Sequence, residues 1–147
     1  MAVNFHPNKI NEATVGVSTA VNSAKFHFYG KASHAANAPE NGRSALDAVE
    51  LTDIGANYLR EHVPSDVRIH YTIVDGGVAP NIVPDKAVVW YYMRAFSREV
   101  VENVYERLVK VAKGAAMMTE TELEIEFLGA AITPRTIMCW PVWWQKP

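Results

Sequence analysis

Val67-Arg-Ile-His-Tyr-Thr-Ile-Val-Asp-Gly-Gly-Val-Ala-Pro-Asn-Ile-Val-Pro-Asp-Lys-Ala-Val-Val-Trp-Tyr-Tyr-Met-Arg-Ala95 is the stretch that decides the fold of this chain. Residues 67–74 alternate between apolar and polar side chains and stop at Asp75-Gly76-Gly77, which predicts a half-buried strand followed by a turn. Residues 86–95 are rich in Val, Trp and Tyr, which favour strands. The stretch therefore predicts two consecutive strands joined by a tight, proline-containing connection.

A helix is predicted on each side of this strand pair. Ser44 is a good N-cap with Asp47 three residues later, and the helix runs to about His62, shortly before Pro64. Ser97 begins a second helix, in which apolar side chains recur with the i, i+3, i+4, i+7 spacing of one buried face. These side chains are Val101, Val104, Tyr105, Leu108, Ala112, Ala115 and Ala116.

Two outer strands complete the pattern. Residues 25–29 and 121–128 alternate cleanly, and residues 14–21 alternate loosely. The order strand, helix, strand, strand, helix, strand predicts an α+β, ferredoxin-like βαββαβ fold, with a four-stranded antiparallel sheet and both helices on one face. In the usual strand order, 4-1-3-2, the first strand starts beside the end of the last. Such a domain is suited to insertion into another one.

The domain boundaries follow from composition. Residues 1–13 are polar and irregular and are interpreted as a lead-in, residues 14–131 as the domain, and residues 132–147 as a separate tail that holds three of the four tryptophans. A chain of 147 residues has the length of one domain. We therefore expect one folded unit.

Charge and cysteine content exclude several functions. Fourteen Lys and Arg against sixteen Asp and Glu leave a net charge of −2, which argues against nucleic-acid and anionic-membrane partners. No run of eighteen apolar residues predicts a membrane span. The single Cys139 excludes an internal disulfide, and the N-terminus lacks the apolar run of a signal peptide. We expect a cytoplasmic protein without nucleic-acid or membrane partners.

The first helix is more apolar than packing on one sheet requires. Its polar side chains occupy an arc of only about 100°; they are Glu50, Asp53, Asn57, Arg60 and Glu61. Either the helix is well buried within the domain, or a second surface covers it. The long edge strand 67–74, with few inward charges or bulge signals, favours the second interpretation. We expect a homodimer formed through strand 67–74 and helix 44–62, in which the edge strands pair across the twofold axis.

Three residues stand out chemically. His34 lies between small residues after Gly30, Asn81 lies in the connection between the central strands, and Arg94 follows thirteen residues later. Taken singly, they would be a loop histidine without a role, a turn residue and a surface charge at a strand end.

Together, these residues lie in stretches that resemble the dimerization, or lid, domain of the aminoacylase and carboxypeptidase G type of zinc metallopeptidases. The matching stretches are Phe26–Ala36, Gly42–Ala48, Gly76–Asp85 and Arg94. The resemblance covers about residues 14–130. Within that family the chain is most similar to the aminobenzoyl-glutamate hydrolase group, through Ala20–Phe28 and Met118–Phe127.

The resemblance implies a role for each residue. His34 matches the histidine that reaches into the partner subunit's active site and polarises the scissile carbonyl oxygen. Asn81 matches the asparagine that contacts substrate across the dimer, and Arg94 matches the arginine that receives the substrate carboxylate. A fixed donor suits an oxyanion, and a planar guanidinium suits a carboxylate.

The family's metal ligands are missing from this chain. The family binds two metal ions through a His-x-Asp motif and a Glu-Glu pair among other residues. None of the five histidines here is followed two residues later by Asp, and no Glu-Glu pair occurs. We expect no metal site and no catalysis by this chain alone, with two zinc ions held by a catalytic domain of the parent enzyme, which would be a second partner.

Two other functions compete with this interpretation. A free-standing ferredoxin-like module could bind a small ligand or regulate a partner. RNA binding through the sheet is disfavoured, because no aromatic RNP-type motif occurs and the charge is slightly acidic.

Overall fold

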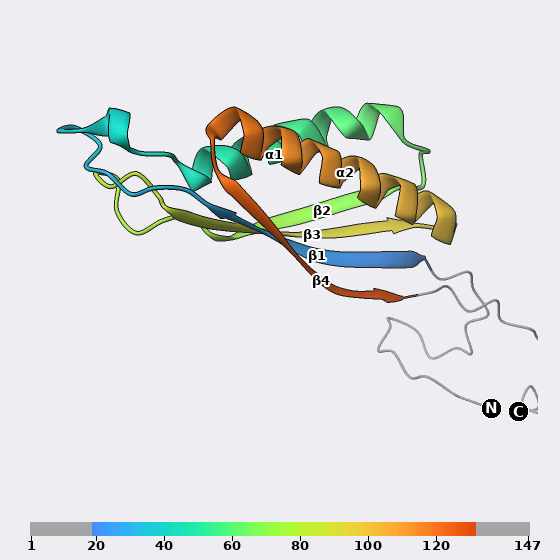
Figure 1. The fold of residues 1–147 in the computed structure, drawn as a ribbon. Helices are drawn as coiled ribbons and strands as arrows, with labels where there is room; N and C mark the ends of the chain where they lie inside the picture. The colour runs from blue at the N-terminus through green and yellow to red at the C-terminus, as the bar shows by residue number, and fades with distance from the viewer. Residues whose placement is uncertain (1–18, 132–147) are drawn as a thin grey trace, which may run out of the picture.

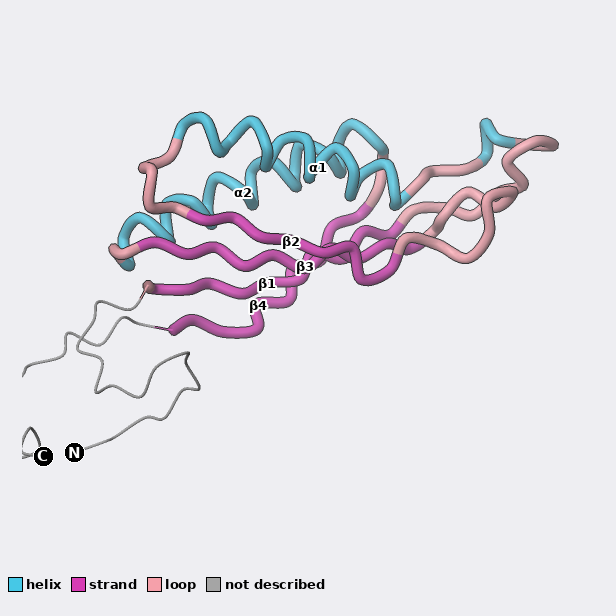
Figure 2. The backbone as a smooth tube through the Cα atoms, turned by 180° about the vertical axis from the view of Figure 1, so that it is seen from behind, coloured by secondary structure: helices cyan, strands magenta, loops and turns pink. Residues whose placement is uncertain are grey.

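One antiparallel sheet with two helices on a single face makes up the described part of the chain (Figures 1 and 2). The structure is a computed structural model that describes residues 19–131. The strand order is β2-β3-β1-β4. The elements are β1 (Ala20–Tyr29), α1 (Ala45–Leu59), β2 (Arg68–Asp75), β3 (Lys86–Ala95), α2 (Arg98–Thr119) and β4 (Glu122–Ala131), with short 3-10 helices at Pro39–Asn41 and Arg60–His62. The predicted α+β, ferredoxin-like arrangement is confirmed.

The first strand differs most from the prediction. The sequence predicts a loose strand over 14–21 and a clean one over 25–29, whereas β1 is continuous from Ala20 to Tyr29. Asn22 and Ser23 interrupt the apolar alternation, yet they pair with Met93 and Tyr92 of β3. The backbone ladder therefore overrides the side-chain pattern here. Residues 14–18 lie outside the described residues, as do the predicted lead-in 1–13 and the predicted tail 132–147.

The other bounds agree with the prediction to within a few residues. β3 spans the predicted 86–95, β2 is shifted by one residue, and β4 continues to Ala131. The predicted helix 44–62 divides into α1 and a 3-10 turn, because the N–H of Arg60 bonds to the carbonyls of Asn57 and Tyr58 as the last turn tightens.

The core lies between the sheet and the two helices. Alternate side chains of β1 and β3 point into it, so that Phe26 and Tyr91 are fully buried and meet edge-on with ring centroids 5.6 Å apart. From α2, Val101, Val104 and Leu108 fill the other side, as the predicted stripe requires. The opposite face of the sheet is left open (Figure 1).

One prediction for α1 is wrong. Ser44 caps the helix as predicted, accepting the N–H of Asp47 at 3.2 Å. The helical pattern places Asp53 in the polar arc, but it is buried and accepts a hydrogen bond from the Tyr91 hydroxyl. A buried tyrosine needs an acceptor, and helix packing places Asp53 above the sheet to provide one. Ile54 and Tyr58 remain 48% and 68% exposed on the outer side of α1.

The two edge strands are β2 and β4. β2 contains a bulge between Ile73 and Asp75, which the sequence did not signal. At the other edge, Ala131 pairs with Val21, so the described chain begins and ends on neighbouring strands, as expected. No helix within residues 19–131 is long and apolar enough to cross a membrane.

Candidate functional site

Two loops lie side by side at one end of the sheet (Figures 1 and 2). Residues 30–44 leave β1 and residues 76–85 lead into β3; together we call them the loop end. His34 forms an isolated antiparallel bridge with Ile82. The amide of Ala35 donates to the carbonyl of Asn81 at 3.0 Å. The structure therefore brings His34 and Asn81, two of the three predicted site residues, next to each other.

Backbone groups hold the base of the loop end. Gly30 N–H donates to the carbonyl of Asp85 at 2.8 Å, and Lys31 and Arg43 exchange hydrogen bonds of 2.8 and 2.9 Å. Gly30 must be glycine, because a Cβ there would lie 2.0 Å from the carbonyl oxygen of Arg43. Gly77 has φ of 104°, a conformation that suits glycine. Close backbone approach thus determines this end.

The ring of His34 is oriented by its own loop. Its Nδ1 accepts the amides of Ala36 and Asn37, each at 3.2 Å. An acceptor nitrogen carries no proton, so the neutral ring carries its proton on Nε2. The side chain is exposed. The loop therefore presents Nε2–H as a donor at the surface, a feature that sequence reasoning missed.

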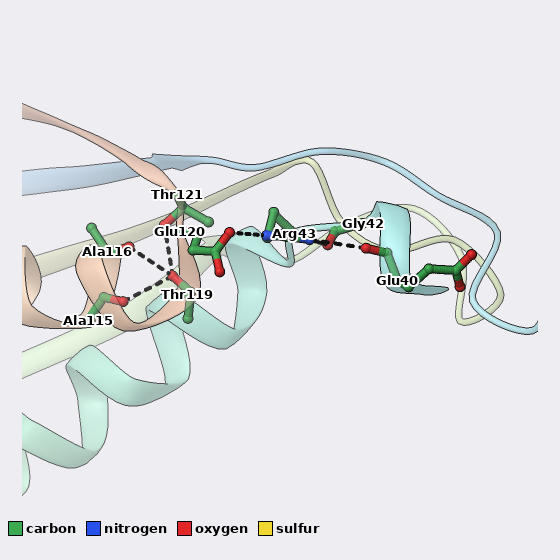
Figure 3. Close-up of polar contacts among 8 residues, drawn as sticks. All are labelled: Glu40, Gly42, Arg43, Ala115, Ala116, Thr119, Glu120 and Thr121. Carbon is green, nitrogen blue, oxygen red and sulfur yellow. Dashed lines mark hydrogen bonds and ion pairs between the residues drawn. The ribbon is translucent and has the colours of Figure 1, made fainter. Parts of the chain in front are cut away.

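Arg43 ties the loop end to the end of α2 (Figure 3). Its Nε lies 2.6 Å from Oε2 of Glu120, and its Nη1 donates to the carbonyls of Glu40 and Gly42. Glu120 itself has φ of 55° and ends the helix in the left-handed conformation. The two residues are 77 positions apart, so no local sequence signal could have found the pair.

Arg94 does not join the other two residues. It lies near the far end of β3, and the eight steps from Lys86 to Arg94 span roughly 26 Å at the rise of a strand. Its exposed side chain belongs to the open face of the sheet. We call this part the arginine end. Within one chain, Arg94 and the His34–Asn81 pair occupy opposite ends of the sheet.

The open face carries a row of acidic side chains on β4. Glu126 pairs with His27 at 3.1 Å, and Glu124 accepts the hydroxyl of Tyr29 at 3.0 Å. This hydrogen bond raises the pKa of Tyr29. These acids lie opposite the loop-proximal half of β1, away from Arg94, which lies beside Val21. They do not neutralise the arginine end.

The other shifted pKa values belong to buried groups away from both ends. Burial raises the pKa of Asp53, and its hydrogen bond from Tyr91 partly opposes the shift. Burial and the bond to Asp53 raise the pKa of Tyr91. Burial also raises the pKa of Tyr105. The Asp53–Tyr91 pair stabilises the packing of α1 on β3.

A metal ion does not fit the described residues. Across residues 19–131, no three His, Cys, Asp or Glu side chains lie together in a way that could hold one. Two zinc ions, if they act with this domain, need ligands from elsewhere.

Known proteins share the sequence and the architecture of this chain. The family model described as the peptidase dimerisation domain matches residues 20–118. The chain is 45% identical to a p-aminobenzoyl-glutamate hydrolase polypeptide of Escherichia coli (strain K12), over 86% of this chain and 26% of that protein. It is 35% identical to the Xaa-Arg dipeptidase of Mus musculus, over 82% of this chain and 28% of that protein.

A solved structure extends the match. The crystal structure of an aminobenzoyl-glutamate utilization protein from Klebsiella pneumoniae aligns with a TM-score of 0.68 and 30% identity, over 78% of this chain and 29% of that chain. This chain therefore spans about a quarter of the length of these relatives.

Proposed function

Since the chain belongs to the peptidase dimerisation domain family, we propose that it is the dimerisation and substrate-lid domain of a metal-dependent amidohydrolase. The family resemblance predicted from the motifs is thereby confirmed. The proposed substrates are N-acyl amino acids similar to aminobenzoyl-glutamate, the compound named in the relatives at 45% and 30% identity.

The observation that carries the proposal is the separation of the site residues. His34 and Asn81 lie at the loop end, whereas Arg94 lies at the arginine end, roughly 26 Å of strand away. An N-acyl amino acid is much shorter than this distance. One substrate molecule can meet all three side chains only if two chains contribute to each site. A dimer supplies this arrangement, with Arg94 from one subunit and His34 and Asn81 from the other.

His34 is suited to stabilise the developing oxyanion. Its Nδ1 is occupied by two amide donors, so Nε2–H points away from its own loop as a hydrogen-bond donor. A donor that is already oriented needs no rearrangement when negative charge develops on the carbonyl oxygen. The exposed side-chain amide of Asn81, on the adjoining loop, is the second proposed contact to substrate.

Arg94 is the proposed receptor for the substrate carboxylate. A guanidinium offers two parallel N–H donors that match the two oxygens of a carboxylate. The acidic side chains of the open face pair with other residues and leave this arginine available. The two zinc ions, their ligands and the hydrolytic chemistry are assigned to the rest of a longer protein, and the described residues alone are proposed to be non-catalytic.

The proposed homodimer uses the β2 edge and the outer side of α1. The side chains of Ile54 and Tyr58 on α1, and of Tyr71 and Ile73 on β2, are large, apolar and between 39% and 68% exposed. Pairing the β2 edges across a twofold axis would satisfy their backbone groups and cover this surface.

Sedimentation of the chain tests the dimer. We expect a dimer at tens of micromolar, and a monomer for the Ile54→Asp, Tyr58→Asp double variant, whose positions are too exposed to affect the fold strongly. Met117→Asp on α2, at an 81% exposed position, is the matched control and should remain dimeric. A wild-type chain that stays monomeric would favour the free-standing module instead.

Mixed dimers of a full-length relative test the shared site. The counterpart of His34→Ala should lower kcat by two to three decades, because it removes a donor to charge that exists mainly in the transition state. The counterpart of Arg94→Ala should mainly raise KM. A His34→Ala subunit mixed with one disabled only in its metal ligands should regain activity in one of its two sites. Mixed dimers that fold but stay inactive contradict the proposal.

A further inference from the structure

We propose that Tyr92 is a positioning residue that holds the guanidinium of Arg94 ready to receive a substrate carboxylate. This inference rests on the role proposed for Arg94 above and extends it to a second residue. It starts from how Arg94 is held on an otherwise open sheet face.

The ring of Tyr92 is the contact that orients Arg94. Cζ of Arg94 lies 5.6 Å from the centroid of the Tyr92 ring, the range of a cation–π interaction. The two residues are two positions apart on β3, so their side chains project from the same face. Within residues 19–131, Arg94 has neither a hydrogen-bond nor an ion-pair partner.

Tyr92 is itself held by a row of side chains. Its ring lies 5.4 Å from that of Trp90, at an interplanar angle of 46°. The indole Nε1 donates to Oγ of Ser23 at 2.9 Å, and Lys25 Nζ lies 5.8 Å from the Trp90 ring. Tyr92 and Trp90 are both half-buried. The indole hydrogen bond thus fixes the back of the row, and Arg94 is its outer end.

Stacking orients a guanidinium without using its donors. The N–H bonds of arginine lie in the plane of the group, whereas a ring contacts its face. The bidentate edge therefore stays available for a carboxylate. Arg68, directly opposite Arg94 on β2, is held differently: its Nη1 donates to the carbonyls of Ser65 and Val67 at 2.7 and 2.8 Å. Arg68 uses donors to stay in place, and Arg94 does not.

Side-chain NMR of the full 147-residue chain tests the stacking directly. In the wild type, we expect the Arg94 side-chain protons to be shifted upfield by the ring and its Nε–H to show restricted motion. Tyr92→Leu should abolish both effects, and Tyr92→Phe, which keeps the ring face, should preserve them. The Nε–H of Arg68 is the internal control and should be unchanged in all three proteins.

A second variant guards against misfolding of Tyr92→Leu. Ser23→Ala removes only the acceptor behind Trp90, and it should loosen Arg94 partially. An unshifted, mobile Arg94 in the wild type overturns the proposal without any variant. The proposal is also wrong if Tyr92→Leu folds and leaves Arg94 as ordered as before.

Titration with N-benzoyl-glutamate separates this inference from the proposed function. We expect Tyr92→Leu to weaken binding about two- to fivefold, Tyr92→Phe to leave it unchanged, and Arg94→Ala to remove the response. Equal responses in wild type and Arg94→Ala overturn the carboxylate role of Arg94, and with it the proposed function. A loss in Arg94→Ala without any weakening in Tyr92→Leu overturns only the positioning role of Tyr92.

Discussion

The loop end and the arginine end hold their side chains by different means. At the loop end, backbone hydrogen bonds between residues 30–44 and 76–85 set the geometry, and most side chains there are exposed. At the arginine end, a packed row of side chains on a continuous sheet positions Arg94. Loops with little buried apolar area have low local stability. The loop end is therefore the part that steric and backbone changes should disturb most selectively.

This difference matches what each end is proposed to do. A residue that serves another subunit's site must project beyond its own domain, and a loop can do this. A residue that binds a carboxylate beside its own catalytic domain benefits from the rigidity of a sheet. Four substitutions probe the contrast between the loop end and the sheet-and-helix body.

Gly30→Ala should have the largest effect. The added methyl group would meet the backbone carbonyl of Arg43, which cannot move without breaking its pairing with Lys31. We expect a loss of roughly 3 kcal/mol in the free energy of unfolding, measured in urea. The amide resonances that change should belong mainly to residues 30–44 and 76–85.

Gly114→Ala is the matched control for this substitution. Gly114 lies inside α2 with open space around it, so alanine should stabilise the helix by up to about 1 kcal/mol. Similar unfolding curves for the two variants would show that the close approach at Gly30 does not constrain the loop end.

Tyr91→Phe tests the body of the domain. It removes the hydroxyl that donates to the buried Asp53 and leaves that carboxyl group without this partner. We expect a loss of about 2 kcal/mol in the free energy of unfolding. The resonances of His34 and Asn81 should stay in place. Changes at the loop end as large as those in the body would contradict the independence of the two regions.

Asp53 should make the stability of the body depend on pH. Burial raises the pKa of Asp53 above its ordinary 3.8. Between that value and the raised one, the folded chain binds more protons than the unfolded chain. The free energy of unfolding should therefore fall as pH rises through this window, by at most about 1.4 kcal/mol per pH unit for one proton.

The Asp53→Asn variant isolates this contribution. Unfolding in urea is measured from about pH 4 upward for both proteins, and the wild type should lose stability relative to the variant as pH rises. Parallel pH profiles would mean that Asp53 titrates alike in both states.

Arg43→Gln should have the smallest effect on stability. Its ion pair with Glu120 is partly exposed, and such pairs contribute less than about 1 kcal/mol. The loop-end resonances should nonetheless shift, because the variant releases the loop from α2. Arg98→Gln, which breaks the partly exposed pair with Glu102, is the control and should shift none of them.

The positions of the main elements were predictable because their signals are local. Residues 86–95 form β3 as predicted, and Ser44 and Ser97 cap the two helices. Alternation and helical spacing depend on near neighbours, which the sequence displays directly. The strand order followed from the order of elements, because few chain paths satisfy the rules for connections.

The details of the candidate site were less predictable. The motif identified His34, Asn81 and Arg94, but it did not reveal that Nδ1 of His34 accepts two amides. The prediction of a polar surface at Asp53 is wrong because helical periodicity does not show which element lies above which strand. The pair of Arg43 and Glu120 joins residues far apart in the chain, and no pattern of neighbours could reveal it.

The sequence by itself determined the type, order and approximate bounds of the elements, and through its motifs the family of the domain. Hydrophobic periodicity and capping act over a few residues, so they are written locally in the chain. Only the tertiary structure decided that the His34–Asn81 pair and Arg94 occupy opposite ends, and that Tyr92 lies against the guanidinium. Those relations depend on strand register and packing between distant segments, which arise only when the whole sheet forms.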